Sequence, residues 1–270
     1  MKVGEIFCKS ALVKSNIPSI DYALNPYLGC EHGCVYCYAS FMQRYYHQNE
    51  VWGEFVDVKV NFAERLRSQI KRTKPGLVYL SSVTDPYQPL EKKYKLTREC
   101  LKILVELDFP VSIQTKSDLV LRDLDILKGM SDCEVGFTIT TLDEKIRGKF
   151  EPRTSTIDQR FKALKILKEN EISTFAFFGP ILPYFSDNKK TIHSLLKQLS
   201  QLGVERVYLD KINYKGRNWS RISKFIMTDF PEIFNYYLWT KNSKGLYSKK
   251  LKNTISECIQ DLRLNVEVVF

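Results

Sequence analysis

The residues best suited to chemistry are three cysteines near the start of the chain. Cys30, Cys34 and Cys37 lie in the string NPYLGCEHGCVYCY, separated by three and two residues, and two glycines in this string give the backbone freedom to curl. Thiolate sulfur is the usual ligand of iron–sulfur clusters, and a four-iron cube on three thiolates keeps one corner without a protein ligand. The spacing therefore favours an iron–sulfur cluster on a loop over residues 25–38.

Zinc is the main alternative to an iron–sulfur cluster, because it also binds thiolates. A structural zinc site needs four ligands in a closed tetrahedron. His32 lies inside the loop but is poorly placed to join all three sulfurs, while His47 and His193 are distant in sequence. The chain has no second C-x-x-C, so zinc and unliganded thiols stay open as weaker alternatives.

The remaining cysteines stand alone in the sequence and predict no disulfide framework. The total of seven is odd, and the first residues, MKVGEIFCKS, carry no apolar core of a secretory signal. We expect a cytoplasmic protein in which the isolated cysteines are packing residues. These are Cys8, Cys100, Cys133 and Cys258.

Composition excludes a disordered chain and an integral membrane protein. The 270 residues are 44% hydrophobic, and no apolar run approaches the ~20 residues of a membrane-spanning helix. Lys and Arg outnumber Asp and Glu by 41 to 31, a net charge of +10 that favours polyanionic partners such as nucleic acid. The alternative is solubility, because many basic residues fall on expected solvent faces, for example Lys162, Lys165 and Lys168.

The elements that must position the loop alternate between short apolar strands and amphipathic helices. Helix starts are indicated at Thr97, at Thr156 with Gln159 as a capping box, and at Thr191. Repeated strand–helix–strand order requires parallel strands with right-handed crossovers. This predicts an α/β fold, a partial (β/α)6 barrel, with an open doubly wound sheet as the alternative. The expected strands are residues 20–25, 77–80, 111–115, 134–140, 174–179 and 206–209.

From residue 213 the pattern changes to aromatic and basic residues. We therefore divide the chain into residues 1–212, the barrel, and residues 213–270, a mainly helical C-terminal extension packed on it, with an apolar end strand at 265–270. The aromatic residues are interpreted as packing in the seam, with base stacking as the alternative. They are Tyr214, Trp219, Phe225, Phe230, Phe234, Tyr236, Tyr237 and Trp239.

The cysteine string, an aromatic residue before the last cysteine and the preceding strand together resemble the radical S-adenosylmethionine superfamily. Residues 20–210 are similar to its spore photoproduct lyase-like branch, through NPYLGCEHGCVYCYA, LSSVTDPYQPLE, TKSDLVLRDLD and TITTLDEKIRGKFEPR. Each string includes or follows the C-terminal end of an expected strand. Active sites of barrel enzymes are assembled at these strand ends. The resemblance implies a [4Fe-4S] cluster and S-adenosyl-L-methionine, which is cleaved to methionine and a 5′-deoxyadenosyl radical that abstracts hydrogen.

The resemblance also implies roles for individual residues. Cys30, Cys34 and Cys37 would ligate the cluster. Tyr36 would pack near adenine, and Tyr38 would join it or contact substrate.

The later strands would supply the rest of the cofactor site. Thr84 and Asp85 would receive the methionine amino group, and Lys116 would bind the carboxylate. One of Thr138 and Thr140, expected on one strand face, would bond the ribose. Glu151 and Arg153 would lie in a charged loop with Lys145, Arg147 and Lys149 that binds cofactor or an anionic substrate, unless it is a solvated surface loop.

One position departs from the lyase. Its hydrogen-donating cysteine aligns with Ser82, and a hydroxyl O–H is too strong to quench a substrate radical. Photoproduct repair is therefore not expected, and the catalytic residues that act on substrate stay unassigned.

The sequence thus predicts a radical S-adenosylmethionine enzyme with an unidentified substrate. Nucleic acid is the leading substrate class, a peptide or protein is next, and flavodoxin or ferredoxin is the expected type of electron donor. The alternative is a non-catalytic nucleic-acid-binding module stabilised by zinc or a cluster. An electron-transfer protein is a third interpretation, weakened by the missing fourth cysteine.

Overall fold

The computed structural model describes all 270 residues, which form two compact units. Unit 1 comprises residues 1–33, 42–137 and 153–174, and unit 2 comprises residues 34–41, 138–152 and 175–270. The chain passes from unit 1 to unit 2 inside the cysteine loop, between Gly33 and Cys34. The boundary expected after residue 212 lies within unit 2 and stays a prediction.

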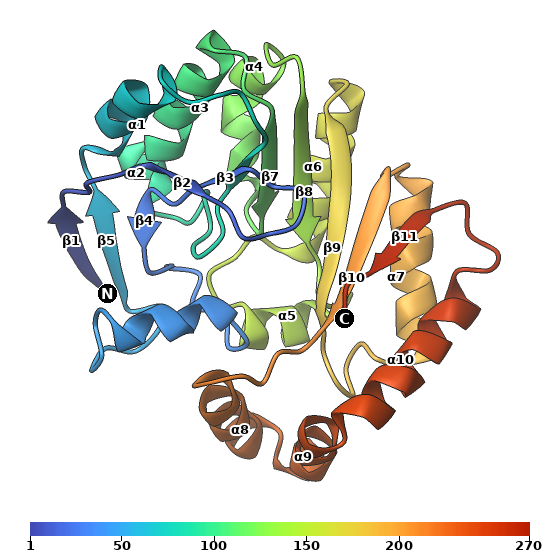
Figure 1. The fold of residues 1–270 in the computed structure, drawn as a ribbon. Coiled ribbons are helices and arrows are strands. Elements are labelled where there is room, and N and C mark those ends of the chain that lie inside the picture. Colours follow the sequence, from blue (N-terminus) through green and yellow to red (C-terminus); the bar gives the residue numbers. More distant parts are fainter. The chain divides into compact units, whose positions relative to one another are not determined.

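Unit 1 is built on a parallel sheet in sequence order. Strands β3 (Tyr22–Leu24), β6 (Val78–Leu80), β7 (Val111–Thr115) and β8 (Cys133–Thr138) pair in that order, and β2 (Leu12–Lys14) pairs antiparallel with β3. Strand β6 is largely buried, which explains its apolar composition, and β7 is buried as well although it includes Ser112, Gln114 and Thr115. The helices of this unit are α1 (Phe62–Ile70), α2 (Glu91–Tyr94), α3 (Leu96–Glu106), η2 (Asp118–Asp123), α4 (Leu124–Leu127) and α6 (Ile157–Glu169) (Figure 1).

A second, three-stranded sheet in unit 1 was not predicted. Strand β1 (Lys2–Ile6) pairs parallel with β5 (Phe55–Lys59), and β4 (Tyr27–Leu28) pairs antiparallel with β5. Strand β4 is too short for any pattern, and β1 is mostly exposed. The sheet matters because β4 leads directly into the cysteine loop. Gly29 has a φ of +86°, and a Cβ there would lie 2.6 Å from the Phe55 carbonyl oxygen, so this turn requires glycine.

Unit 2 contains three further parallel strands. Strand β10 (Arg206–Lys211) pairs with β9 (Ser173–Ile181) and with β11 (Asn265–Val268). The helices are η1 (Tyr38–Arg44), which continues into unit 1, α5 (Glu144–Phe150), α7 (Lys189–Gln201), α8 (Asn218–Asp229), η3 (Pro231–Ile233), α9 (Phe234–Asn242) and α10 (Lys244–Cys258) (Figure 1). All six expected strands and the end strand are present, which confirms the α/β fold with parallel strands. No helix is both long enough and apolar enough to cross a bilayer.

The predicted helix starts are partly right. Thr156 and Gln159 form the capping box at α6 as expected. Helix α7 is capped instead by Asn188, whose side chain accepts a hydrogen bond from the Thr191 backbone N–H. Thr97 lies inside α3, where its hydroxyl donates to the Pro86 carbonyl oxygen at 2.6 Å.

The aromatic residues of the C-terminal segment mostly fill the core of unit 2. Phe225 and Phe230 contact Phe150, with ring centroids 4.8 and 6.3 Å away. Tyr237 is buried in the same cluster, which includes Cys34. Packing, rather than base stacking, is therefore the role of most of these rings.

Candidate functional site

The first half of the cysteine loop is held by the segment that follows β6. The Gly33 N–H donates to the Cys30 carbonyl oxygen at 3.2 Å, closing a turn around the buried Cys30. The Thr84 hydroxyl donates to the Gly29 carbonyl oxygen at 2.6 Å. The Gln88 side-chain oxygen accepts from the Glu31 N–H at 2.8 Å. Two predicted site regions, the loop and the Thr-Asp turn, thus meet inside unit 1.

Asp85 organises the carboxyl ends of β6 and β7. One carboxylate oxygen accepts from the Thr115 hydroxyl at 2.7 Å and the Tyr87 N–H at 2.9 Å, and the other accepts from the Lys116 N–H at 2.9 Å. Burial alone pushes the pKa of Asp85 up, but His32, Lys116 and the Thr115 hydroxyl outweigh it and hold the pKa well below its usual range. Asp85 therefore stays ionised, and it brings Lys116 next to the Thr-Asp turn.

His32 faces this carboxylate. Its Nδ1 lies 3.3 Å from the Asp85 carboxylate, and only 2% of the side chain is exposed. The contact is electrostatic, because Nδ1 has no hydrogen-bond partner.

The second half of the loop is held by helix α8. The Cys37 N–H donates to the Cys34 carbonyl oxygen at 3.2 Å, forming a tight turn. The Arg221 guanidinium donates to the carbonyl oxygens of Cys34 at 2.6 Å and Cys37 at 3.3 Å. The Asn218 side-chain amide donates to the Tyr36 carbonyl oxygen at 3.2 Å. Three carbonyls of the turn are thus satisfied by one helix.

The Arg221 guanidinium also supplies a half-buried positive charge. Burial lowers the pKa of Arg221, while the nearby sulfurs of Cys37 and Cys34 act in the opposite direction. A cation next to two thiols favours their thiolate forms, which are the forms that ligate metal. Sequence reasoning missed Arg221 and Asn218. Their i, i+3 spacing places them on one helix face, but nothing in it points to the cysteine loop.

Glu151 is a buried hydrogen-bond centre of unit 2. Its side chain is fully buried and accepts hydrogen bonds from the Tyr36 hydroxyl and, at 3.0 Å, from the Thr140 hydroxyl. The Arg147 guanidinium donates to the Glu151 carbonyl oxygen at 2.8 Å. Three residues expected in the cofactor site therefore meet here.

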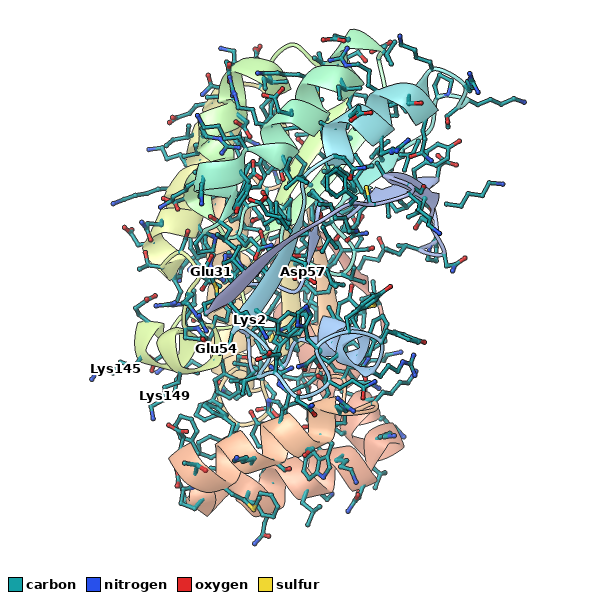
Figure 2. The ribbon with its side chains drawn as sticks, turned by 90° about the vertical axis from the view of Figure 1, so that its left-hand side faces the viewer. Lys2, Glu31, Glu54, Asp57, Lys145 and Lys149 are labelled. Atoms are coloured by element: carbon teal, nitrogen blue, oxygen red, sulfur yellow. The ribbon has the colours of Figure 1, made fainter.

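The charged loop expected around Glu151 is wrong in its main feature. Residues 144–150 form helix α5, and only its outward side chains are solvated. Lys145 and Lys149 extend away from this helix (Figure 2), and Lys149 Nζ lies 2.8 Å from an Asp229 carboxylate oxygen. The sequence misled because Glu151 follows the helix and turns its side chain inward.

Arg153 belongs to unit 1. Its guanidinium pairs with the Glu54 carboxylate at 2.6 Å. A Cβ on Gly33, whose φ is +62°, would lie 3.3 Å from the same guanidinium. Arg153 therefore covers the glycine at the middle of the loop.

The remaining expected residues have mixed positions. Thr138 and Thr140 are both buried, but β8 ends at Thr138, so the expected strand to residue 140 is too long. Tyr38 is 53% exposed and begins η1. Among the isolated cysteines, Cys100 and Cys258 are buried, whereas Cys8 and Cys133 are half-buried. Burial raises the pKa of Cys133 to about 12, as expected for an inert packing thiol.

None of the seven cysteines forms a disulfide, and no group of three or more His, Cys, Asp or Glu side chains is arranged as a metal site. Thiolates are nevertheless the ligand type of iron–sulfur clusters, and the Arg221 guanidinium is bonded to the turn that carries two of the three loop cysteines. The Cys30 turn is held separately by Thr84 and Gln88.

The fold and these residues define a known class of protein. Residues 24–210 match the Radical SAM superfamily, so the chain belongs to this superfamily and is a radical SAM enzyme. Its fold is that of spore photoproduct lyase. The lyase complexed with dinucleoside spore photoproduct aligns with a TM-score of 0.74 and 16% identity, over 99% of this chain and 82% of the lyase.

Two proteins illustrate the range of sequence similarity to this chain. The uncharacterized protein MJ0683 of Methanocaldococcus jannaschii is 41% identical over 257 residues, covering 95% of this chain and 94% of that protein. The Radical SAM Nalpha-GlyT isomerase of Pseudomonas phage M6 is 24% identical over 82% of this chain and 46% of the phage protein.

Proposed function

We propose that Cys30, Cys34 and Cys37 hold a [4Fe-4S] cluster and that the protein uses it to cleave S-adenosylmethionine. The observation that carries this proposal is the hold of Arg221 on the Cys34–Cys37 turn, in a chain of this superfamily. When bound, the reduced cluster supplies the electron that divides the cofactor into methionine and a 5′-deoxyadenosyl radical. The protein's own residues hold the thiolates, keep Cys30 and Cys34 buried and Cys37 half-buried, and bind the cofactor.

The Asp85 network supports a site for the methionine part of the cofactor. Asp85 stays ionised, so its negative charge attracts the ammonium of an amino acid, and the Thr84 hydroxyl lies beside it in sequence. The hydrogen bond from the Lys116 N–H to Asp85 brings that lysine's segment to the same strand ends. We assign Lys116 to the cofactor carboxylate.

The Glu151 network supports a site for the nucleoside part. Tyr36 and Thr140 are fixed by their hydrogen bonds to Glu151, which makes Glu151 a positioning residue in this proposal. Thr138 or Thr140 would bond the ribose, and Tyr36 with Tyr38 would contact the adenine. Arg153 would act through the loop, because it covers Gly33 and pairs with Glu54.

We further propose that the enzyme abstracts hydrogen from a nucleic acid and receives its electron from a flavodoxin or ferredoxin. The net charge of +10 and the likeness to a lyase solved with a dinucleoside support this substrate class. Photoproduct repair itself is disfavoured, because Ser82 offers a hydroxyl where a thiol is needed. That hydroxyl accepts a hydrogen bond from the Asn25 amide at 3.0 Å.

The decisive experiment is anaerobic reconstitution followed by addition of a reductant and S-adenosylmethionine. Formation of 5′-deoxyadenosine by a brown protein supports the proposal. A brown protein that holds four irons yet makes no 5′-deoxyadenosine contradicts it. A colourless protein that binds zinc and nucleic acid would favour the non-catalytic module instead.

A further inference from the structure

A pocket of unit 2 lies where β10 ends, and no step of the proposed reaction uses it. The pocket has a volume of about 300 Å³, at the lower end of the range of small-molecule sites. It extends from the last residues of β10 to helices α9 and α10. Carboxyl ends of parallel strands are the usual place for ligands in such folds.

The pocket lining is strongly basic. Lys211, Lys215 and Lys244 contribute three ammonium groups, against the single carboxylate of Asp210. The adjoining segment, residues 241–252, carries five lysines and no acidic residue. Lysines collected on one pocket and one helix are unlike those of α6, where Lys162 pairs with Asp158 at 2.8 Å.

Lys211 is the lysine of the pocket lining whose position is fixed by surrounding residues. It is half-buried, and its ammonium donates to the Ser248 hydroxyl on α10. The same ammonium lies 5.2 Å from the centre of the Phe270 ring, and the Lys252 ammonium lies 5.5 Å from that ring. Two lysines thus converge on one aromatic side chain beside the pocket.

The charges around Lys211 are incompletely balanced. Burial lowers the pKa of Lys211, and repulsion by Lys252 and Lys244 acts in the same direction, with Asp210 opposing. Burial raises the pKa of Asp210, the one carboxylate of the lining. An anion in the pocket would relieve this repulsion, which is a favourable contribution to binding.

We propose that this pocket binds a phosphate ester. A compact ammonium is well suited to phosphate oxygens, and three of them match a group with more than one negative charge. The rings of Tyr214 and Tyr247 complete the lining and give an apolar wall for the organic part of the ester. The proposal does not depend on cleavage of S-adenosylmethionine.

The test measures binding by the full-length, cluster-containing protein without reductant, so that loss of radical chemistry does not affect the result. The probes are thymidine 5′-monophosphate, inorganic phosphate and a short single-stranded oligodeoxynucleotide. We expect K215Q and K244Q each to weaken binding about tenfold, as for one charge-assisted hydrogen bond. The controls K162Q and K165Q should stay within about twofold of wild type.

The three probes distinguish the sources of the phosphate. Tightest binding of the oligodeoxynucleotide, with a steep salt dependence, identifies a nucleic-acid backbone. Equal or tighter binding of the monophosphate identifies a free ester. Absence of binding by all three probes, or equal losses in the control variants, would overturn the proposal.

A second measurement does not rely on substitutions. The pKa of Lys211, followed by NMR of lysine labelled at Cε, should rise when the pocket is saturated with thymidine 5′-monophosphate. An unchanged pKa under saturation would contradict the assignment.

Discussion

The two halves of the cysteine loop are held by different kinds of interaction. The first half, with Cys30, is fixed by Thr84 and Gln88, which follow strand β6 directly. The second half, with Cys34 and Cys37, is fixed by a half-buried arginine, Arg221 of helix α8. The difference teaches that short polar side chains suffice where a strand end already lies beside the loop. The Cys34–Cys37 turn is instead held by the long cationic side chain of Arg221, which extends to it from helix α8.

The largest effect is expected from removal of a cysteine in the second half. Cys34→Ala should abolish 5′-deoxyadenosine formation and most of the cluster absorbance, because three thiolates are the minimum for the proposed site. Iron content and product formation are measured after anaerobic reconstitution. Cys8→Ala is the matched control and should keep both. Retention of a full cluster by Cys34→Ala would break the comparison, since Cys34 would then not be a ligand.

Removal of the Arg221 guanidinium tests the second half without changing a proposed ligand. Arg221→Met keeps much of the side-chain volume but removes the guanidinium hydrogen bonds to the carbonyl oxygens of Cys34 and Cys37. We expect the free energy of unfolding to fall by about 3 kcal/mol, from two charge-assisted hydrogen bonds. Denaturant unfolding measures this change, and Arg217→Met on the exposed side should alter it by less than about 0.5 kcal/mol. Equal losses in both variants would show that Arg221 is not a specific clamp.

Removal of the ionised carboxylate tests the first half through pH. The folded pKa of Asp85 lies below its unfolded value of about 3.9. Its stabilisation is therefore fully present above that value and is lost as pH falls toward the folded pKa. Asp85→Asn should remove on the order of 2 kcal/mol at neutral pH and flatten the acid limb of the stability curve.

Unfolding free energies between neutral pH and pH 3 provide the measurement for Asp85→Asn. A variant whose acid limb matches that of wild type would show that Asp85 is not the carboxylate responsible.

The smallest effect is expected from the Glu151 network. Tyr36→Phe deletes the hydroxyl that donates to the buried Glu151 carboxylate, and we expect a loss of about 1 kcal/mol. Thermal unfolding compared with Tyr184→Phe, whose ring is 58% exposed, sharpens the assignment. Indistinguishable midpoints would remove Tyr36 from the positioning network.

The sequence was informative where chemistry follows from neighbouring residues. The apolar strands, the capping box at Thr156 and the nearness of Asp85 to Lys116 all follow from local patterns and from the rule that parallel strand ends meet. The short strand β4 and the hold of Arg221 on the turn were not predictable. Their partners are fixed by tertiary packing, and neither two-residue strands nor single arginines carry a signal of what they contact.

Glu151 is a residue whose surroundings were predicted incorrectly from the neighbouring sequence. The surrounding lysines and arginine suggested a charged loop, but they lie on a helix that exposes Lys145 and Lys149 and leaves Arg147 half-buried. Burial of one carboxylate at the end of such a helix depends on the hydroxyls of Tyr36 and Thr140, which lie elsewhere in the sequence. A charged stretch of sequence predicts solvent exposure as a whole and does not reveal that one carboxylate within it is buried.

The reach of Arg221 also sets an order of events during synthesis. It lies 187 residues after Cys34, so the ribosome adds the clamp long after both cysteines have emerged. A nascent chain that ends at residue 212 carries all three thiols yet lacks the cation that orients two of them. We therefore expect iron to be retained poorly by such stalled chains and well by completed ones, which radioactive iron would reveal.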